Sequence, residues 1–155
     1  MKRVVLDTNI LVGSAYDEHS ASWRIVDACI RGELTAIVSQ SLQGEYEEIL
    51  SRTVRMRGHE EQIRKFLAVA ERVRPTVVPH VVQDDPDDDK VLAAAVTGNA
   101  DAVITNDRHL LQLDPYRPEG STRPLRIVQP AAFEQSRTEE QGSGWSALSR
   151  LIGIR

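Results

Sequence analysis

Short apolar runs rich in β-branched residues alternate along this chain with segments whose apolar residues recur at helical spacing. The runs cover residues 3–7, 35–39, 102–105 and 125–128. Between most of them the apolar side chains follow a period near 3.6, which is typical of helices that bury one face. Strands that alternate with helices favour a parallel sheet covered by helices on both faces. We therefore predict an α/β fold, a three-layer α/β/α sandwich around a mostly parallel central sheet.

The chain has about one domain's worth of sequence and a separate C-terminal segment. A chain of 155 residues removes roughly 70% of its unfolded surface from water, which is enough for one core. Residues 1–135 form this predicted domain. Residues 136–155 begin with a polar, glycine-containing stretch that cannot bury enough apolar surface to order itself. They are predicted to be a spacer and tail, in which the spacing of Trp145 and Leu148 suits a short helix.

Composition and charge exclude several classes of protein. The 19 basic and 23 acidic residues give a net charge of −4, which argues against a protein coated in basic residues. No apolar run approaches the ~20 residues that a membrane helix requires, so a membrane role is excluded. The single cysteine, Cys29, rules out an internal disulfide, and its place on an apolar helical stripe indicates packing. These features predict a cytoplasmic protein.

The middle of the chain is dense in charge. A helix is predicted to end before Pro75, and residues 76–82 are then expected to form a short edge strand, because Pro79 limits strand pairing. Residues 130–133 are expected to form a last short turn. The segment between residues 52 and 74 is also a candidate for binding phosphates, because its basic residues outnumber its acidic ones. The candidate substrate-binding residues are Arg55, Arg57 and Arg64, and a solvated helical face is the alternative.

Carboxylates stand at four places where chemistry would require them. Asp7 and Asp107 each follow a predicted strand, and Glu45 lies on the apolar stripe of a predicted helix. A cluster of aspartates at residues 84–89 begins another helix. Each has a plainer interpretation: an aspartate after a strand often caps a helix or forms a turn, and a glutamate among glutamates often faces solvent. Five aspartates in six residues exceed what capping requires.

Carboxylates that converge in one cleft repel one another and bind hard cations such as Mg²⁺ and Mn²⁺. Two such ions can activate water and stabilise the leaving oxygen when a phosphodiester is hydrolysed. The spacing excludes a calcium EF-hand, because Lys90 and Val96 stand where that loop needs glycine and glutamate. Glycine-rich phosphate loops are absent, and the four histidines show no pairing at the spacing of metal ligands. The acidic residues therefore favour metal-dependent nuclease chemistry.

Four segments, taken in order, resemble the PIN-domain family. They are VVLDTNILV at residues 4–12, SLQGEYEEIL at residues 41–50, DPDDDKVL at residues 85–92 and ADAVITNDRHLL at residues 100–111. More narrowly, they are similar to the bacterial PIN proteins that act as VapC-like toxins of toxin–antitoxin systems. The resemblance implies a Mg²⁺- or Mn²⁺-dependent endoribonuclease with RNA as substrate and a cognate antitoxin protein as partner. It also implies a homodimer, since relatives are commonly dimers.

By this resemblance, the catalytic and metal-binding residues are Asp7, Glu45, Asp88 and Asp107. The third acid lies in a run of alternatives, so Asp85 and Asp89 also stand as candidates. Asn9 and Thr105 would have supporting roles. Many relatives have glycine where this chain has Asn106, which demands more of that turn, although asparagine tolerates a positive φ better than most residues.

Two other functions fit an acidic pocket at strand ends. One is a PIN fold without catalysis, acting as a scaffold or in RNA processing. The other is a Mg²⁺-binding phosphoreceiver domain, which would need a lysine after a late strand, where this chain has none.

Overall fold

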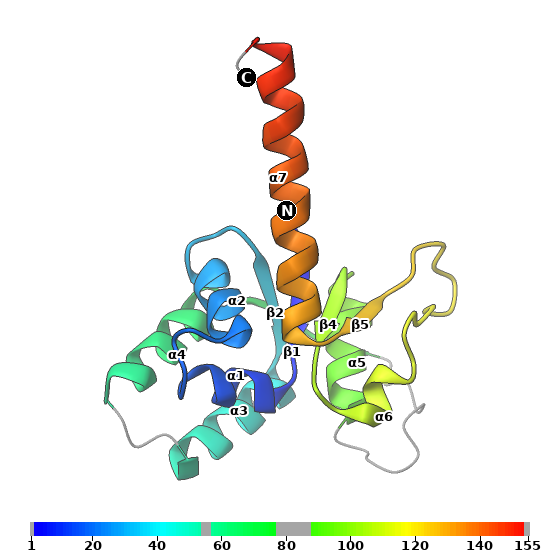
Figure 1. Ribbon diagram of the computed structural model, residues 1–155. Helices are drawn as coiled ribbons and strands as arrows, with labels where there is room; N and C mark the ends of the chain where they lie inside the picture. Colours follow the sequence, from blue (N-terminus) through cyan, green and yellow to red (C-terminus); the bar gives the residue numbers. More distant parts are fainter. Residues whose placement is uncertain (1, 54–56, 77–87, 154–155) are drawn as a thin grey trace.

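The computed structural model describes residues 2–53, 57–76 and 88–153, apart from the side chains of residues 53, 57–59, 88 and 145–150. Within these residues, five strands form one sheet in the order β3-β2-β1-β4-β5 (Figure 1). All neighbouring strands in it run parallel, which confirms the predicted sheet. The strands are β1 (Arg3–Leu6), β2 (Thr35–Ser39), β3 (Glu71–Val73), β4 (Ala102–Ile104) and β5 (Arg126–Val128).

Helices cover both faces of the sheet. The chain builds outward from β1 to β3 and then returns to β4 beside β1, so right-handed crossovers place α1 to α4 on one face and α5 and α6 on the other. Helix α5 packs against β1, β2 and β4, whereas α2 packs against α1, α4 and α7. The predicted three-layer sandwich is confirmed. The helices are α1 (Thr8–Ser14), α2 (Ala21–Ile30), α3 (Gln40–Thr53), α4 (Arg57–Val69), α5 (Asp88–Thr97), α6 (Arg108–Leu111) and α7 (Pro130–Leu151).

The core lies along the two central strands. Val4, Val5 and Leu6 of β1 are fully buried, as are Val103 and Ile104 of β4. A strand with helices on both faces must be apolar on both sides, which explains these continuous runs. The carboxyl ends of β1 and β4 are thereby fixed side by side at the centre of the molecule.

Two elements differ from the sequence-based expectations in the first half of the chain. Helix α1 follows β1 directly, where no helix was predicted. The third strand is Glu71–Val73, which pairs with β2, whereas a helix was predicted up to residue 74 and a strand at residues 76–82. Residues 77–82 lie outside the described part of the chain. The strand was missed because its side chains are exposed or half-buried, so its pairing with β2 comes from backbone hydrogen bonds that carry no hydrophobic signal.

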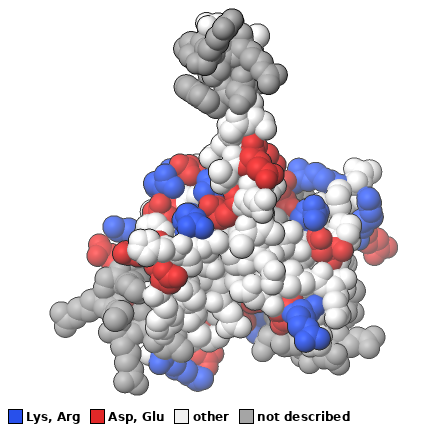
Figure 2. Space-filling view, in the orientation of Figure 1, with Lys and Arg blue, Asp and Glu red and all other residues white. Residues whose placement is uncertain are grey.

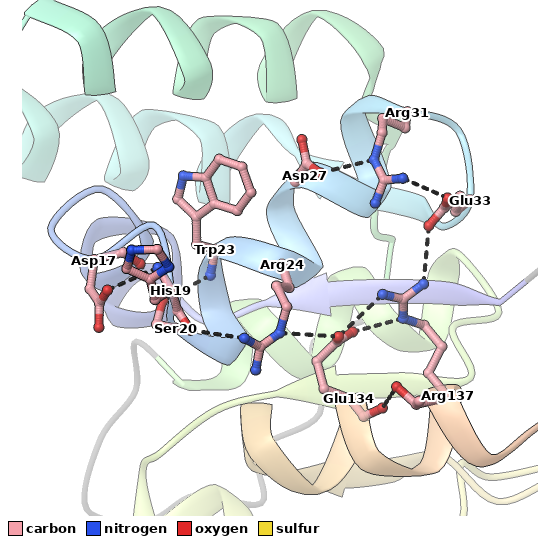
Figure 3. A network of polar contacts seen from close by, with 11 residues as sticks. Asp17, His19, Ser20, Trp23, Arg24, Asp27, Arg31, Glu33, Glu134 and Arg137 are labelled. Carbon is pink, nitrogen blue, oxygen red and sulfur yellow. Dashed lines mark hydrogen bonds and ion pairs between the residues drawn. The ribbon is translucent and has the colours of Figure 1, made fainter. Parts of the chain in front are cut away.

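The C-terminal helix is the largest departure from expectation. Helix α7 begins at Pro130, where a short turn was predicted, and continues through the expected polar spacer to Leu151. Its first turns are held to α2 by a buried carboxylate, Glu134, which accepts a hydrogen bond from Arg137 at 2.7 Å and lies 3.6 Å from the Arg24 guanidinium (Figure 3). Arg137 also donates to Glu33 at 3.1 Å. These contacts explain why a polar sequence is helical here.

The far part of α7 extends away from the rest of the molecule (Figure 1). An ion pair of 2.8 Å joins Lys2 to Glu140, and at the far end Leu151 is 83% exposed. Acidic and basic side chains alternate around the base of the helix, above a largely uncharged face (Figure 2). Among the described residues, no helix combines the length and the apolar character needed to span a bilayer.

Candidate active site

The sheet has one topological switch point, between β1 and β4. The chain leaves β1 toward β2 on one side and leaves β4 toward β5 on the other. In open parallel sheets, ligands bind in the crevice outside the carboxyl ends of the strands at this point. The backbone N–H of Asp7 donates to the Ile104 carbonyl at 3.0 Å, which continues the pairing of the two strands past their ends. Asp7 and Thr105 therefore stand next to each other in the crevice.

Asp7 is a buried carboxylate, 8% exposed. Its Oδ2 accepts a hydrogen bond of 2.7 Å from the Thr105 hydroxyl. Asp7 is the residue before α1, yet its side chain makes no capping hydrogen bond, so capping does not account for this carboxylate. Burial raises the pKa of Asp7, and the negative charges of Asp107 and Glu45 raise it further, against the opposing hydrogen bond from Thr105.

Glu45 reaches the crevice from α3. The Thr8 hydroxyl donates to its Oε1 at 2.7 Å, while its Oε2 is buried and has no hydrogen-bond partner among the described residues. The Lys90 ammonium, on the first turn of α5, lies 3.9 Å from that oxygen. Tyr46 fixes the helix in this position, because its fully buried hydroxyl donates to the Leu6 carbonyl at the end of β1.

Asp107 has two roles at the end of β4. Its Oδ1 accepts from the His109 N–H at 2.8 Å and so caps α6, as the plainer interpretation predicted. Its own N–H donates to the Thr105 hydroxyl at 2.9 Å. The Thr105 hydroxyl therefore contacts both residues, through the carboxylate of Asp7 and the backbone N–H of Asp107. Asn106, between Thr105 and Asp107, does not have a positive φ, so the turn does not need the glycine that many relatives have there.

Of the other predicted site residues, the structure describes the side chains of Asn9, Asp89 and Arg64. Asn9 is exposed on α1, and within the described residues no hydrogen bond joins it to the acids. Asp89 is buried at the start of α5. Arg64 forms an exposed ion pair of 3.1 Å with Glu60 on α4, a helix that packs against α2. Four predicted side chains lie outside the described part of the chain: Arg55, Arg57, Asp85 and Asp88.

Sequence reasoning missed three residues that shape the site. Thr8 directly follows Asp7 and Tyr46 directly follows Glu45, but nothing in this spacing shows which atoms the two side chains contact. Lys90 follows the aspartate run, so its proximity to Glu45 depends on the packing of α5 against α3. Cys29, in contrast, is buried packing as predicted, and burial raises the pKa of its thiol to about 12.

The donor atoms fit a hard divalent cation. Asp7, Glu45 and Asp107 offer carboxylate oxygens, which Mg²⁺ and Mn²⁺ prefer. A cation would satisfy the buried Oε2 of Glu45 and offset the repulsion that raises the pKa of Asp7. Among residues with described side chains, no group of three His, Cys, Asp or Glu residues is arranged so that it could hold a metal ion. The three acids thus supply suitable ligands without forming a closed metal site by themselves.

Comparisons with known proteins agree with this arrangement. A family model described as the PIN domain matches residues 3–109. None of the curated proteins compared matches the chain. Among solved structures, the chain is similar to VapBC2 from Rickettsia felis bound to a DNA fragment from their promoter, with a TM-score of 0.52 and 13% identity, over 81% of this chain and 98% of that one. It is also similar to PAE2754 from Pyrobaculum aerophilum, with a TM-score of 0.52 and 14% identity, over 85% of this chain and 86% of that one.

Proposed function

Because the chain belongs to the PIN-domain family, whose model matches residues 3–109, we propose that it is a metal-dependent endoribonuclease and the toxin of a toxin–antitoxin system. The observation that carries the proposal is the meeting of Asp7, Asp107 and Glu45 at the switch point, where Thr105 and Thr8 hold them. The similarity to VapBC2 supports the toxin role. A cognate antitoxin protein is the proposed partner, and a homodimer the proposed assembly.

The chain's own residues prepare the carboxylates for a cation. Thr105 holds Asp7, Thr8 holds Glu45 and the α6 backbone holds Asp107, each through one oxygen. We assign the metal ligands as Asp7, Glu45 and Asp107 with Asp88 as the fourth acid, and Mg²⁺ or Mn²⁺ as the ion. When bound, such an ion supplies an activated water for attack on the phosphodiester and stabilises the leaving oxygen.

A second candidate function is a PIN domain that binds RNA without cleaving it. One observation favours it: the described acids do not by themselves complete a metal site. The phosphoreceiver alternative is weaker, because Gln129 and Pro130, rather than a lysine, follow the last strand.

A cleavage assay separates these functions. Purified protein is incubated with a 5′-labelled single-stranded RNA of mixed sequence, in Mn²⁺ and in EDTA. We expect wild-type protein to cleave in Mn²⁺ alone, and Asp7→Asn, Glu45→Gln and Asp107→Asn to lose at least ~100-fold in rate, because each removes a ligand charge. Asp27→Asn is the matched control, since Asp27 pairs with Arg31 on the surface of α2. Cleavage that persists in EDTA or in Asp7→Asn would contradict the proposal.

A further inference from the structure

A cavity of about 1040 Å³ opens beside the acidic crevice. It is lined by Ser39 at the carboxyl end of β2, the first turns of α3, the end of β3 with the two residues that follow it, and the start of α5. Gly44, next to Glu45 on α3, is one of the lining residues, and Lys90 is another. Because Lys90 also lies 3.9 Å from Glu45, the cavity adjoins the crevice and shares a wall with it.

The lining is basic in an otherwise acidic protein. Among the described residues, Arg72, Arg74 and Lys90 line the cavity, against one acid, Glu47. Arg74 is exposed, and no hydrogen bond or ion pair engages it among the described residues. Arg72 makes one long contact, 3.4 Å from its Nη1 to the Leu67 carbonyl.

Several arginines elsewhere in the described structure are paired with carboxylates. Arg3, Arg31 and Arg126, for example, each lie within 2.9 Å of a carboxylate. Within the described part of the chain, no carboxylate pairs with Arg72 or Arg74. A cavity lined by two such arginines is suited to a phosphate-bearing ligand, because guanidinium groups match phosphate geometry.

The shape of the cavity also points to a ligand. Gly44 lies inside α3, where glycine costs about 1 kcal/mol relative to alanine. The fold does not require glycine there, because a Cβ at this position would meet no atom within 4 Å. Without a side chain at residue 44, the cavity wall stays open at this point. A concave site of this kind fits a single strand, whereas duplex RNA is recognised across its outer grooves.

We propose that this cavity binds the backbone of single-stranded RNA next to the scissile phosphate, with Arg72 and Arg74 contacting phosphates and Lys90 at the boundary with the acids. These residues position the strand, and the carboxylates act on it. The inference rests on the proposed ribonuclease function and adds to it where the strand enters. It adds substrate contacts at residues 72–74 and at the start of α5 to the sequence-based candidates Arg55, Arg57 and Arg64.

The test measures binding apart from cleavage. In an Asp7→Asn background, fluorescence anisotropy gives the affinity for a labelled single-stranded RNA at several salt concentrations. The measured quantity is the slope of log binding constant against log salt concentration, called here the salt slope. The Arg72→Gln/Arg74→Gln double variant is expected to lower its magnitude by about 1.4, because each lost phosphate contact lowers it by about 0.7. The control, Arg31→Gln/Arg123→Gln, removes the same charge from residues that precede β2 and β5, at the opposite edge of the sheet. It is expected to leave the slope within about 0.3 of the parent.

A steric variant checks the cavity without changing charge. Gly44→Gln is expected to weaken RNA binding at least tenfold, while the control Gly13→Gln binds as the parent does, because Gly13 is exposed on α1 and does not line the cavity. Melting curves establish that each variant is folded.

The outcomes separate this proposal from the proposed function. If wild-type protein cleaves RNA but the cavity double variant matches its control, or Gly44→Gln binds normally, the cavity proposal fails alone. If wild-type protein neither cleaves nor binds RNA, both fail.

Discussion

At the scale of single residues, the Thr105 hydroxyl organises the crevice. It donates to Asp7 at 2.7 Å and accepts from the Asp107 N–H at 2.9 Å, so it joins the ends of the two central strands. Asp7 is buried, and leaving such a group without a hydrogen bond costs about 1–3 kcal/mol. The hydroxyl therefore stabilises a carboxylate whose burial opposes folding.

The raised pKa of Asp7 makes stability depend on pH. Burial, with the charges of Asp107 and Glu45, raises this pKa above its ordinary value of 3.8, so the folded protein binds the proton more tightly than the unfolded chain does. Protonated Asp7 therefore contributes to the free energy of unfolding. This contribution is fully present below the pKa of Asp7 in the unfolded chain and is lost as the pH rises through its pKa in the folded protein. In EDTA at pH 7, Asp7→Asn is expected to melt no lower than wild type, and any gain should vanish below pH ~4.

The measurement is the melting temperature of both proteins across this pH range. Asn keeps an oxygen that accepts from the Thr105 hydroxyl, so the comparison isolates the effect of the charge. If Asp7 were instead a turn or cap residue, the variant would lose ~1 kcal/mol at every pH. A uniform loss would therefore contradict this view of Asp7.

At the scale of elements, sequence patterns predicted four of the five strands and missed the edge strand β3. β1, β2 and β4 carry apolar runs because helices cover both of their faces, and β5, at the other edge, was predicted from Leu125, Ile127 and Val128. β3 carries no such run, since Glu71 and Arg72 face solvent. Helix α1 was missed because it is seven residues long, too short for its buried Ile10 and Leu11 to show a period.

Helix α7 was missed for a different reason. Its composition predicts a spacer, and its docking depends on ion pairs between residues distant in sequence, such as Arg137 with Glu33. Such pairs leave no pattern along the chain. The same holds for the contact between Thr8 and Glu45, whereas Thr105, which contacts Asp7, was among the predicted supporting residues.

These contacts divide α7 into a docked part and an extending part. Ending the chain after residue 141 keeps the contacts of Glu134, Arg137 and Glu140, so the melting temperature is expected to stay within about 2 °C of wild type. Ending it after residue 135 removes Arg137 and leaves buried Glu134 with Arg24 alone. We expect a loss of about 1–2 kcal/mol with a cooperative transition preserved.

Thermal melts of the two truncated proteins compare these parts directly. Equal stability of both would mean that the ion pairs at the base of α7 contribute nothing. A loss well beyond ~2 kcal/mol on ending the chain after residue 141 would show that the extending part belongs to the core.

At the scale of the whole molecule, the crevice and the far end of α7 lie at opposite ends of the molecule (Figure 1). The acids and the basic cavity lie at the carboxyl ends of the strands, whereas α7 extends away from α3 and α6 (Figure 1). A partner bound along the extending part of α7 would therefore leave the crevice open. The order of the four acidic segments predicts that they converge at one sheet edge, because parallel strands end together there. The structure describes the side chains of Asp7, Glu45 and Asp107 at that edge.

The central claim is that Asp7, Glu45 and Asp107 jointly hold a divalent cation. Its most direct test is the shift in melting temperature when Mn²⁺ replaces EDTA, measured for wild type, Asp7→Asn and the surface control Asp27→Asn. At a Mn²⁺ concentration near 100 times the dissociation constant, wild type and the control should gain about 2.7 kcal/mol, or roughly 5–10 °C, and Asp7→Asn should gain less than about 1 °C. A wild-type protein indifferent to Mn²⁺, or an Asp7→Asn variant that gains as much, would contradict it.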